Sequence, residues 1–139
     1  MKILLYILVF ALLFSSFFTF FYGRTLVDYR EIPIYISVGD HLGFNTNNSA
    51  LYFGTLQKGS YAFRSFVVKN EKCEDCIVEL RVDPFLVRWV YFDQETFRLK
   101  KDELKEITAF AFVPDDAAFG NYEGRLYVLL VNDKRKAYK

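Results

Sequence analysis

The chain begins with one long apolar stretch and continues with short segments in which apolar and polar residues alternate. The stretch Ile3–Tyr22 is 20 residues long and contains nothing more polar than Ser15, Ser16 and Thr19. At about 1.5 Å of rise per residue, a helix of this length matches the roughly 30 Å of a bilayer core. Because no polar face recurs at helical spacing, a buried core helix is a poor alternative. The pattern predicts a transmembrane anchor over residues 1–23.

A cleaved secretory signal is the competing interpretation of this stretch. Signal peptides have a shorter apolar core, about 7–15 residues, that ends at a small-x-small site. Here Phe21 and Gly23 would occupy the −3 and −1 positions of such a site, and phenylalanine fits the −3 position poorly. A retained anchor is therefore favoured. The flanking charges do not decide its orientation, because Lys2 on one side faces Arg24 and Arg30 on the other.

After a polar connector, residues 24–31, the chain alternates in the manner of β-strands. Short apolar segments recur about every ten residues between turns rich in Gly, Pro, Asn and Asp, and none has a helical period. The segment 106–113 is the clearest example, with every second residue apolar from Ile107 to Val113. We expect strands at residues 33–38, 50–53, 61–69, 77–82, 87–92, 96–99, 106–113 and 124–132.

Seven or eight short strands in one domain of about 100 residues favour an all-β fold, an antiparallel sandwich of the immunoglobulin-like kind. We place this domain at residues 32–133 and a basic tail at residues 134–139. The strands 61–69 and 77–82 are expected to form a hairpin.

Composition narrows the class of function. The chain has 18 Lys/Arg and 17 Asp/Glu, of which three and two precede Pro33, so the domain carries 15 of each. This balance argues against a nucleic-acid partner, which normally requires a basic excess. The aromatic content of 19% is typical of a packed β-rich domain rather than of a disordered segment.

Cys73 and Cys76 form the most specific local motif, Cys-Glu-Asp-Cys. A redox pair normally begins a helix, which lowers the thiol pKa, whereas this pair lies between two expected strands and beside acids. A zinc site needs two further ligands, and the sequence offers only His41. We therefore predict a disulfide that closes the hairpin, with free thiols as the alternative. Such a disulfide would place the domain in an oxidising compartment.

Asn47, in the triplet Asn-Asn-Ser, is a potential glycosylation acceptor in a polar loop. Together with the disulfide it predicts an extracytoplasmic domain and a cytoplasmic N-terminus. The acids between residues 115 and 123 lack the ligand order of a calcium loop. His41 has no neighbouring Cys or Ser with which to form a nucleophilic pair. We expect no catalytic residue, no metal and no cofactor, and thus no enzyme.

Two expected strands are apolar on both faces, which is unusual for a strand with one face in solvent. Phe110 and Phe112 lie on the second face of the strand 106–113, and Tyr127 and Leu129 on that of the last strand. Either loops or the connector cover these residues, or they form a contact surface for a protein partner or for a second copy of the chain. We take these four as candidate interaction residues.

Turn and strand signatures over residues 51–131 resemble known immunoglobulin-like modules. Leu51–Thr55, Gly59 and Phe66–Asn70 look like modules of the major-sperm-protein and abnormal-spindle/hydin type. Leu99–Gly124 is similar to galactosidase-associated domains of exported and membrane-anchored bacterial and archaeal proteins. Those families often have Pro-Gly in turns where this chain has other residues, and the cysteine pair is not part of their pattern. The resemblance implies an interaction or spacer module without catalytic residues.

These observations predict a membrane-anchored structural or interaction module on the extracytoplasmic face, as a subunit of a cell-envelope or membrane complex. The resemblance implies an archaeal origin. The alternative is an assembly chaperone, or a module that binds carbohydrate or another small ligand through added strands or edge aromatics. The aromatic residues to test for ligand binding are Tyr91, Phe92 and Tyr122.

Overall fold

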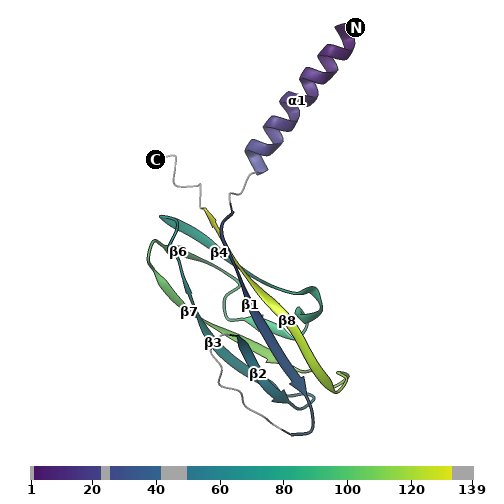
Figure 1. Cartoon of the computed structure of the whole chain (residues 1–139), viewed down its shortest axis with the longest axis vertical. Helices are drawn as coiled ribbons and strands as arrows, with labels where there is room; N and C mark the ends of the chain where they lie inside the picture. Colours follow the sequence, from purple (N-terminus) through teal and green to yellow (C-terminus); the bar gives the residue numbers. More distant parts are fainter. Residues whose placement is uncertain (1, 23–25, 42–49, 133–139) are drawn as a thin grey trace.

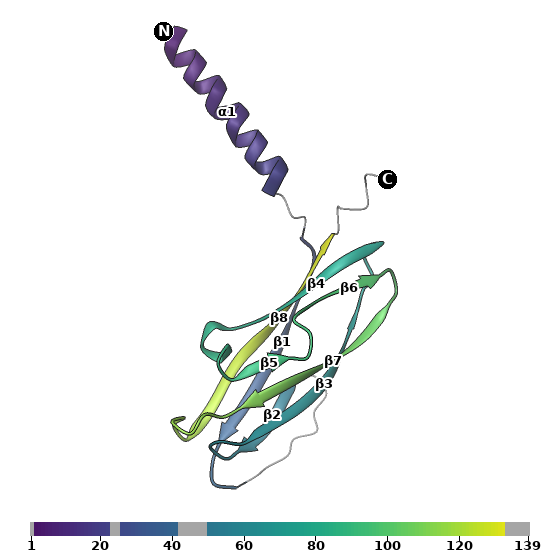
Figure 2. The same cartoon turned by 180° about the vertical axis from the view of Figure 1, so that it is seen from behind.

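The computed structural model describes residues 2–22, 26–41 and 50–132, and in the N-terminal helix it describes the side chains from Leu4 to Ser16. The helix α1 (Lys2–Tyr22) leaves one end of a body made of strands (Figures 1 and 2). A short 3₁₀ helix, η1 (Pro84–Leu86), precedes the fifth strand. The strands are β1 (Leu26–Val38), β2 (Leu51–Leu56), β3 (Tyr61–Lys69), β4 (Asp75–Val82), β5 (Val90–Phe92), β6 (Thr96–Lys100), β7 (Leu104–Phe112) and β8 (Gly120–Asn132).

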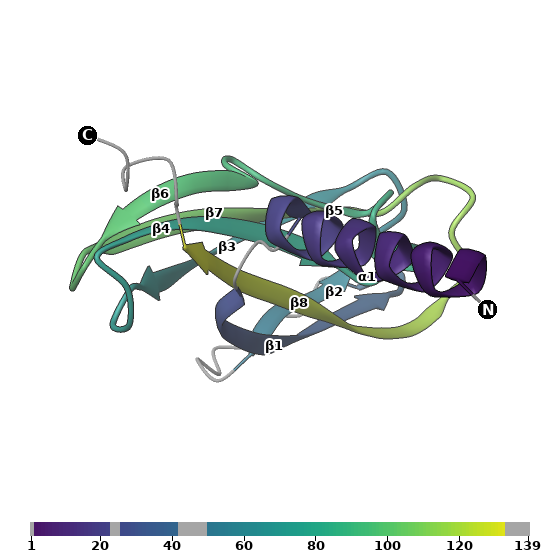
Figure 3. The same cartoon turned by 90° about the horizontal axis from the view of Figure 1, so that it is seen from above.

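The strands form two sheets packed face to face, which confirms the predicted all-β sandwich. The large sheet has the order β2-β1-β8-β4-β6, and the small sheet has the order β3-β7-β5. Seen from the α1 end, β1 and β8 lie in one layer and β7 in the other (Figure 3). All pairs are antiparallel except β1 with β2, which run parallel.

The core lies between the sheets and follows from the alternation of each strand. The inward side chains of the large sheet are bulky, whereas Ala109 and Ala111 of β7 present small side chains to them, and both are fully buried. Large residues facing small ones let two sheets interdigitate at the density of a protein interior. The largest fully buried apolar side chains are Phe53, Ile34, Ile36, Leu86, Leu99, Ile107, Leu126 and Leu130.

The first strand begins earlier than predicted. β1 starts at Leu26, not at residue 33, and pairs with β8 from Leu26↔Val131 to Val38↔Gly120, so most of the predicted connector 24–31 is strand. The alternation pattern did not predict this early start, because several of these residues are polar. In the fold their side chains are paired with charged partners. Asp28 Oδ2 lies 3.1 Å from Arg30 Nε, and its Oδ1 lies 2.8 Å from Lys72 Nζ.

The predicted hairpin of strands 61–69 and 77–82 is wrong. β3 pairs with β7 in the small sheet, whereas β4 pairs with β6 and β8 in the large sheet, so the connection between β3 and β4 crosses from one sheet to the other. The predicted strand 87–92 is also shorter, because Pro84 opens η1 and strand pairing resumes only at Val90. Proline favours this first helical position, since its missing N–H would be unpaired there.

The structure confirms a helix over the apolar N-terminal stretch. Every side chain described in α1, from Leu4 to Ser16, is exposed, and Phe10 stacks on Phe14 with ring centroids 6.1 Å apart. Within the part of the chain that the structure describes, no helix is both long and apolar enough to cross a membrane. The predicted transmembrane span at Ile3–Tyr22 is therefore not confirmed.

Candidate functional site

The outer surface of the small sheet carries a cluster of aromatic side chains, which we call the aromatic face. Strand register places Phe63, Phe110 and Tyr91 in one row across β3, β7 and β5, and Tyr61 beside Phe112 in the next row. The rings of Tyr91 and Phe110 stack with centroids 5.5 Å apart and planes 12° from parallel. The face exists because successive residues of β7 point to opposite sides, so that burying the alanines and isoleucine turns the phenylalanines outward.

The rings of the aromatic face are open to solvent. Tyr61 is 69% exposed, Phe63 59%, Tyr91 47% and Phe112 37%, whereas Phe110 at the centre is half-buried by its neighbours. Over the described residues, no loop covers this face. The interpretation that loops or the connector shield the second face of β7 is therefore not supported by the described part of the chain.

The other two candidate interaction residues lie on the opposite side of the molecule. Tyr127 and Leu129 belong to β8 and face outward from the large sheet, so they do not join Phe110 and Phe112 in one surface. The Tyr127 ring stacks on Tyr29 with centroids 6.1 Å apart. Both residues are half-buried. Tyr127 donates a hydrogen bond to Asp83, and Leu129 lies opposite Tyr29 of β1 and Glu79 of β4 in the strand register.

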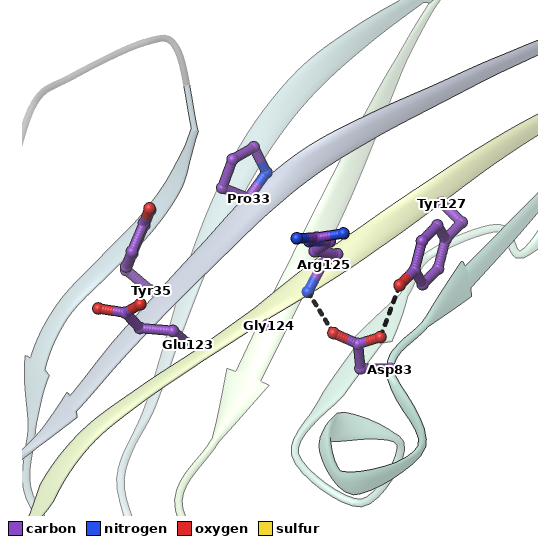
Figure 4. Close-up of a pocket in the computed structure, with 7 residues that line it drawn as sticks. All are labelled: Pro33, Tyr35, Asp83, Glu123, Gly124, Arg125 and Tyr127. Carbon is purple, nitrogen blue, oxygen red and sulfur yellow. Dashed lines mark hydrogen bonds between the residues drawn. The ribbon is translucent and has the colours of Figure 1, made fainter.

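A shallow pocket lies on this outer surface of the large sheet. Its volume is about 510 Å³, and it is lined by Pro33, Tyr35, Asp83, Glu123, Gly124, Arg125 and Tyr127 (Figure 4). Asp83 is committed to the fold, because its Oδ2 accepts a hydrogen bond from the Arg125 backbone N–H at 2.8 Å and its Oδ1 accepts one from the Tyr127 hydroxyl at 2.7 Å. Figure 4 shows Glu123 and Tyr35 together on the other side of the pocket.

Gly124 shapes one wall of this pocket. A Cβ at this position would overlap Leu86 Cδ1 and lie 3.1 Å from Phe85 Cζ, so a side chain here would force Leu86 or η1 to shift. Leu86 is fully buried by this contact. Because residue 124 has no side chain, η1 lies close to β8, and Asp83 can accept the hydrogen bond from the Arg125 backbone N–H.

Two tyrosines on this outer surface of the large sheet have raised pKa values. The hydrogen bond to Glu31 raises the pKa of Tyr29 to about 12, and the hydrogen bond to Asp83 raises the pKa of Tyr127. Both hydroxyls donate these hydrogen bonds to a carboxylate. Among the described residues, no group of three or more His, Cys, Asp or Glu side chains could hold a metal ion. The pocket lining offers two carboxylates, those of Asp83 and Glu123, of which that of Asp83 is held by two hydrogen bonds.

Cys73 and Cys76 form a disulfide in the structure, with Cα atoms 5.9 Å apart, inside the usual range. Both residues are buried. The disulfide lies in the connection between β3 and β4, which crosses from one sheet to the other, and does not close a hairpin as predicted. It lies at the end of the sandwich from which α1 leaves. Asn47 lies outside the described residues, and His41 is exposed.

The aromatic residues expected for ligand binding do not form one site. Tyr91 lies on the aromatic face, whereas Phe92 points inward and meets Phe66 edge to face at 6.2 Å. Tyr122 donates a hydrogen bond to the Ala118 carbonyl at 2.8 Å. Sequence reasoning missed Tyr61 and Phe63, although the strand 61–69 is apolar on both faces and carried the same signal as β7.

Comparisons of this chain with protein-family models, with curated proteins and with solved structures gave no match. The resemblance to the major-sperm-protein and galactosidase-associated modules therefore stays a prediction.

Proposed function

We propose that this chain is a membrane-associated interaction module of a cell-envelope or membrane complex, in which α1 holds the sandwich at the extracytoplasmic surface and the aromatic face binds a protein partner. The open aromatic face carries this proposal. From the exposed fractions of Tyr61, Phe63, Tyr91 and Phe112, its rings expose about 400 Å². Patches of roughly 300–600 Å² are the largest on ordinary monomers and are often functional.

The character of α1 supports the membrane part of the proposal. Its described side chains are apolar and exposed almost throughout, so the helix has no polar face to present to water. Burial in lipid would remove this apolar surface from water at a gain of about 25 cal/mol per Å². The disulfide at Cys73–Cys76 and the acceptor triplet at Asn47 support an oxidising, extracytoplasmic compartment.

A pair of matched variants tests the interaction surface. Tyr61→Ser/Phe63→Ser removes two exposed rings from the aromatic face, whereas Phe119→Ser removes a ring with the same 59% exposure as Phe63 from elsewhere on the sandwich. When the full chain is purified from native membranes in mild detergent, we expect the wild type and Phe119→Ser to retain a bound protein. The double variant is expected to lose it. Retention of the same partner by the folded double variant would refute the proposal.

The side of the membrane is tested separately by protease protection on intact cells. We expect added protease to cleave the sandwich from outside. Full protection in intact cells, with cleavage after lysis, would contradict the extracytoplasmic placement while leaving the interaction surface untouched.

The pocket on the large sheet favours a second candidate function, the binding of carbohydrate or another polyol. Tyr35 is held against Tyr52 with ring centroids 4.6 Å apart, and the Glu123 carboxylate lies beside it. Such a ring and carboxylate can contact the apolar face and the hydroxyls of a sugar, respectively. A glycan-binding screen tests this candidate, with Glu123→Ala as the variant expected to lose any hit. A screen without hits would argue against it.

A further inference from the structure

We propose that the aromatic face binds a second copy of this chain, so that two aromatic faces pack against each other around a two-fold axis parallel to the strands of the small sheet. This inference rests on the proposed function and names the partner of that surface.

The size of the face is sufficient for a dimer. On the same side of β3 and β7, beyond the pair Ser65–Thr108, Val67 is 59% exposed beside Glu106 and Leu104 is 60% exposed beside Lys69. Together with the aromatic rings, they bring the exposed apolar area on this side of the sheet to about 600 Å². Two copies would therefore bury about 1,200 Å², which is the lower limit of specific, stable interfaces. Sheets that pack face to face with aligned strands are an established arrangement, with an angle of about 30° between them.

The order of the rings suits a two-fold axis. β7 is the central strand of the small sheet, so rotation about an axis along it places β7 against β7 of the second copy and β3 against β5. In the row formed by Phe63, Phe110 and Tyr91, each Phe110 then meets its own counterpart, and each Phe63 meets Tyr91 of the other copy. Such an isologous contact pairs aromatic with aromatic at every position in the row.

The position of α1 selects this axis over others. α1 leaves from one end of the strands (Figures 1 and 2), so rotation about an axis parallel to the strands keeps both α1 helices at the same end of the dimer. Two copies can then hold their helices in one membrane. A two-fold axis perpendicular to the strands would put the helices at opposite ends. Association of both α1 helices with the same membrane therefore favours the two-fold axis parallel to the strands.

Single cysteines at chosen positions test the pairing directly. Thr108, half-buried on the outer side of β7 next to the Phe110 row, would lie close to its own counterpart across the axis. Ser37, also half-buried, lies on the outer surface of the large sheet and would be remote from its counterpart. The native cysteines are buried and do not compete. The variants are Thr108→Cys and the control Ser37→Cys, each in the full chain in lipid nanodiscs or mild detergent.

Sheets packed face to face lie about 10 Å apart, which is too far for a direct disulfide, so the cysteines are linked with a short bis-maleimide crosslinker. We expect it to link most Thr108→Cys chains into dimers and to leave Ser37→Cys chains unlinked. Adding Tyr61→Ser/Phe63→Ser to Thr108→Cys should reduce linking at least tenfold, with near-ultraviolet circular dichroism as the check that the sandwich remains folded. Equal linking of the two cysteine variants, together with a monomeric mass in detergent, would overturn self-association.

A photo-crosslinking amino acid at Tyr61 separates the two proposals. Crosslinking to another copy of the chain supports the dimer. Crosslinking only to a different membrane protein overturns the dimer but leaves the proposed interaction surface standing. The absence of any crosslink in native membranes overturns both.

Discussion

Asn70, at the end of β3, is the polar residue whose loss should cost the sandwich most. Its side chain is fully buried, and it makes hydrogen bonds with Lys72 and Cys73 of the crossing between sheets and with Leu99 of β6. The amide Nδ2 donates to the carbonyls of Cys73 at 2.8 Å and Leu99 at 3.1 Å. The amide Oδ1 accepts from the backbone N–H groups of Lys72 at 3.2 Å and Cys73 at 3.1 Å.

The change Asn70→Ala removes all four of these hydrogen bonds. A net contribution of about 1 kcal/mol for each would give about 4 kcal/mol. The exposed N–H of Lys72 can turn to water, so its share is lost only in part, whereas the groups of Cys73 and Leu99 remain buried without these partners. We expect a decrease of about 3 kcal/mol in the free energy of unfolding. For a domain of about 100 residues, this lowers Tm by roughly 12–24 °C.

Urea unfolding of the full chain in mild detergent, followed by the fluorescence of Trp89, measures this decrease. Trp89 is a suitable probe because its ring packs on Tyr122 with centroids 4.4 Å apart in the native state. Asn121→Ala is the matched control, since that exposed side chain makes one hydrogen bond, accepted from the Ser37 hydroxyl at 2.8 Å. We expect the control to cost less than about 1 kcal/mol. A loss for Asn70→Ala no larger than the control's would refute the reasoning.

Three further predictions follow from other contacts. A hydrogen bond from Lys72 holds the pKa of Asp28 below its usual value. The contribution of Asp28 to stability is therefore present above about pH 4 and is lost as the pH falls further. Asp28→Asn should flatten the acid limb of a stability–pH profile, and an unchanged limb would contradict this. The disulfide closes a very short loop, so replacing Cys73 and Cys76 together by alanine should cost about 2 kcal/mol in urea unfolding, and a loss of 5 kcal/mol would disprove this estimate. Gly124→Ala should cost about 1–3 kcal/mol by forcing η1 away from β8, whereas Glu123→Ala next to it should be nearly neutral; equal effects would count against the packing argument.

The strands of the sandwich could be predicted because the alternation of apolar and polar residues that forms a strand is a local property of the sequence. In β7 the side-chain period of two is visible from Ile107 to Ala111, and the structure buries these alternate residues as expected. The start of β1 could not be predicted, because residues such as Asp28 are polar and are accepted in the strand only through distant partners. The alternation pattern could not predict that β3 pairs with β7 either, since the partner of a strand depends on the whole fold and not on its neighbours in sequence.

The four candidate interaction residues lie on two different surfaces, and their role in an interaction stays a prediction. Phe110 and Phe112 were identified from the second face of one strand, and they belong to the open aromatic face. Tyr127 and Leu129 carried the same signal but lie on the other sheet. Periodicity shows that a strand has two apolar faces. It does not show which strands share a sheet, or which polar groups form hydrogen bonds with the residues on those faces.

The ladder between β1 and β8 also determines how the module would respond to mechanical load. β1 is the first strand after α1, and it is paired on both sides, with β2 and with β8. A pull on α1 against a partner held at the aromatic face would act along β1 and load these hydrogen bonds in shear. Bonds that run across the pull must break together rather than one after another. The strand that joins the sandwich to α1 is thus also the strand best placed to resist extraction from the fold.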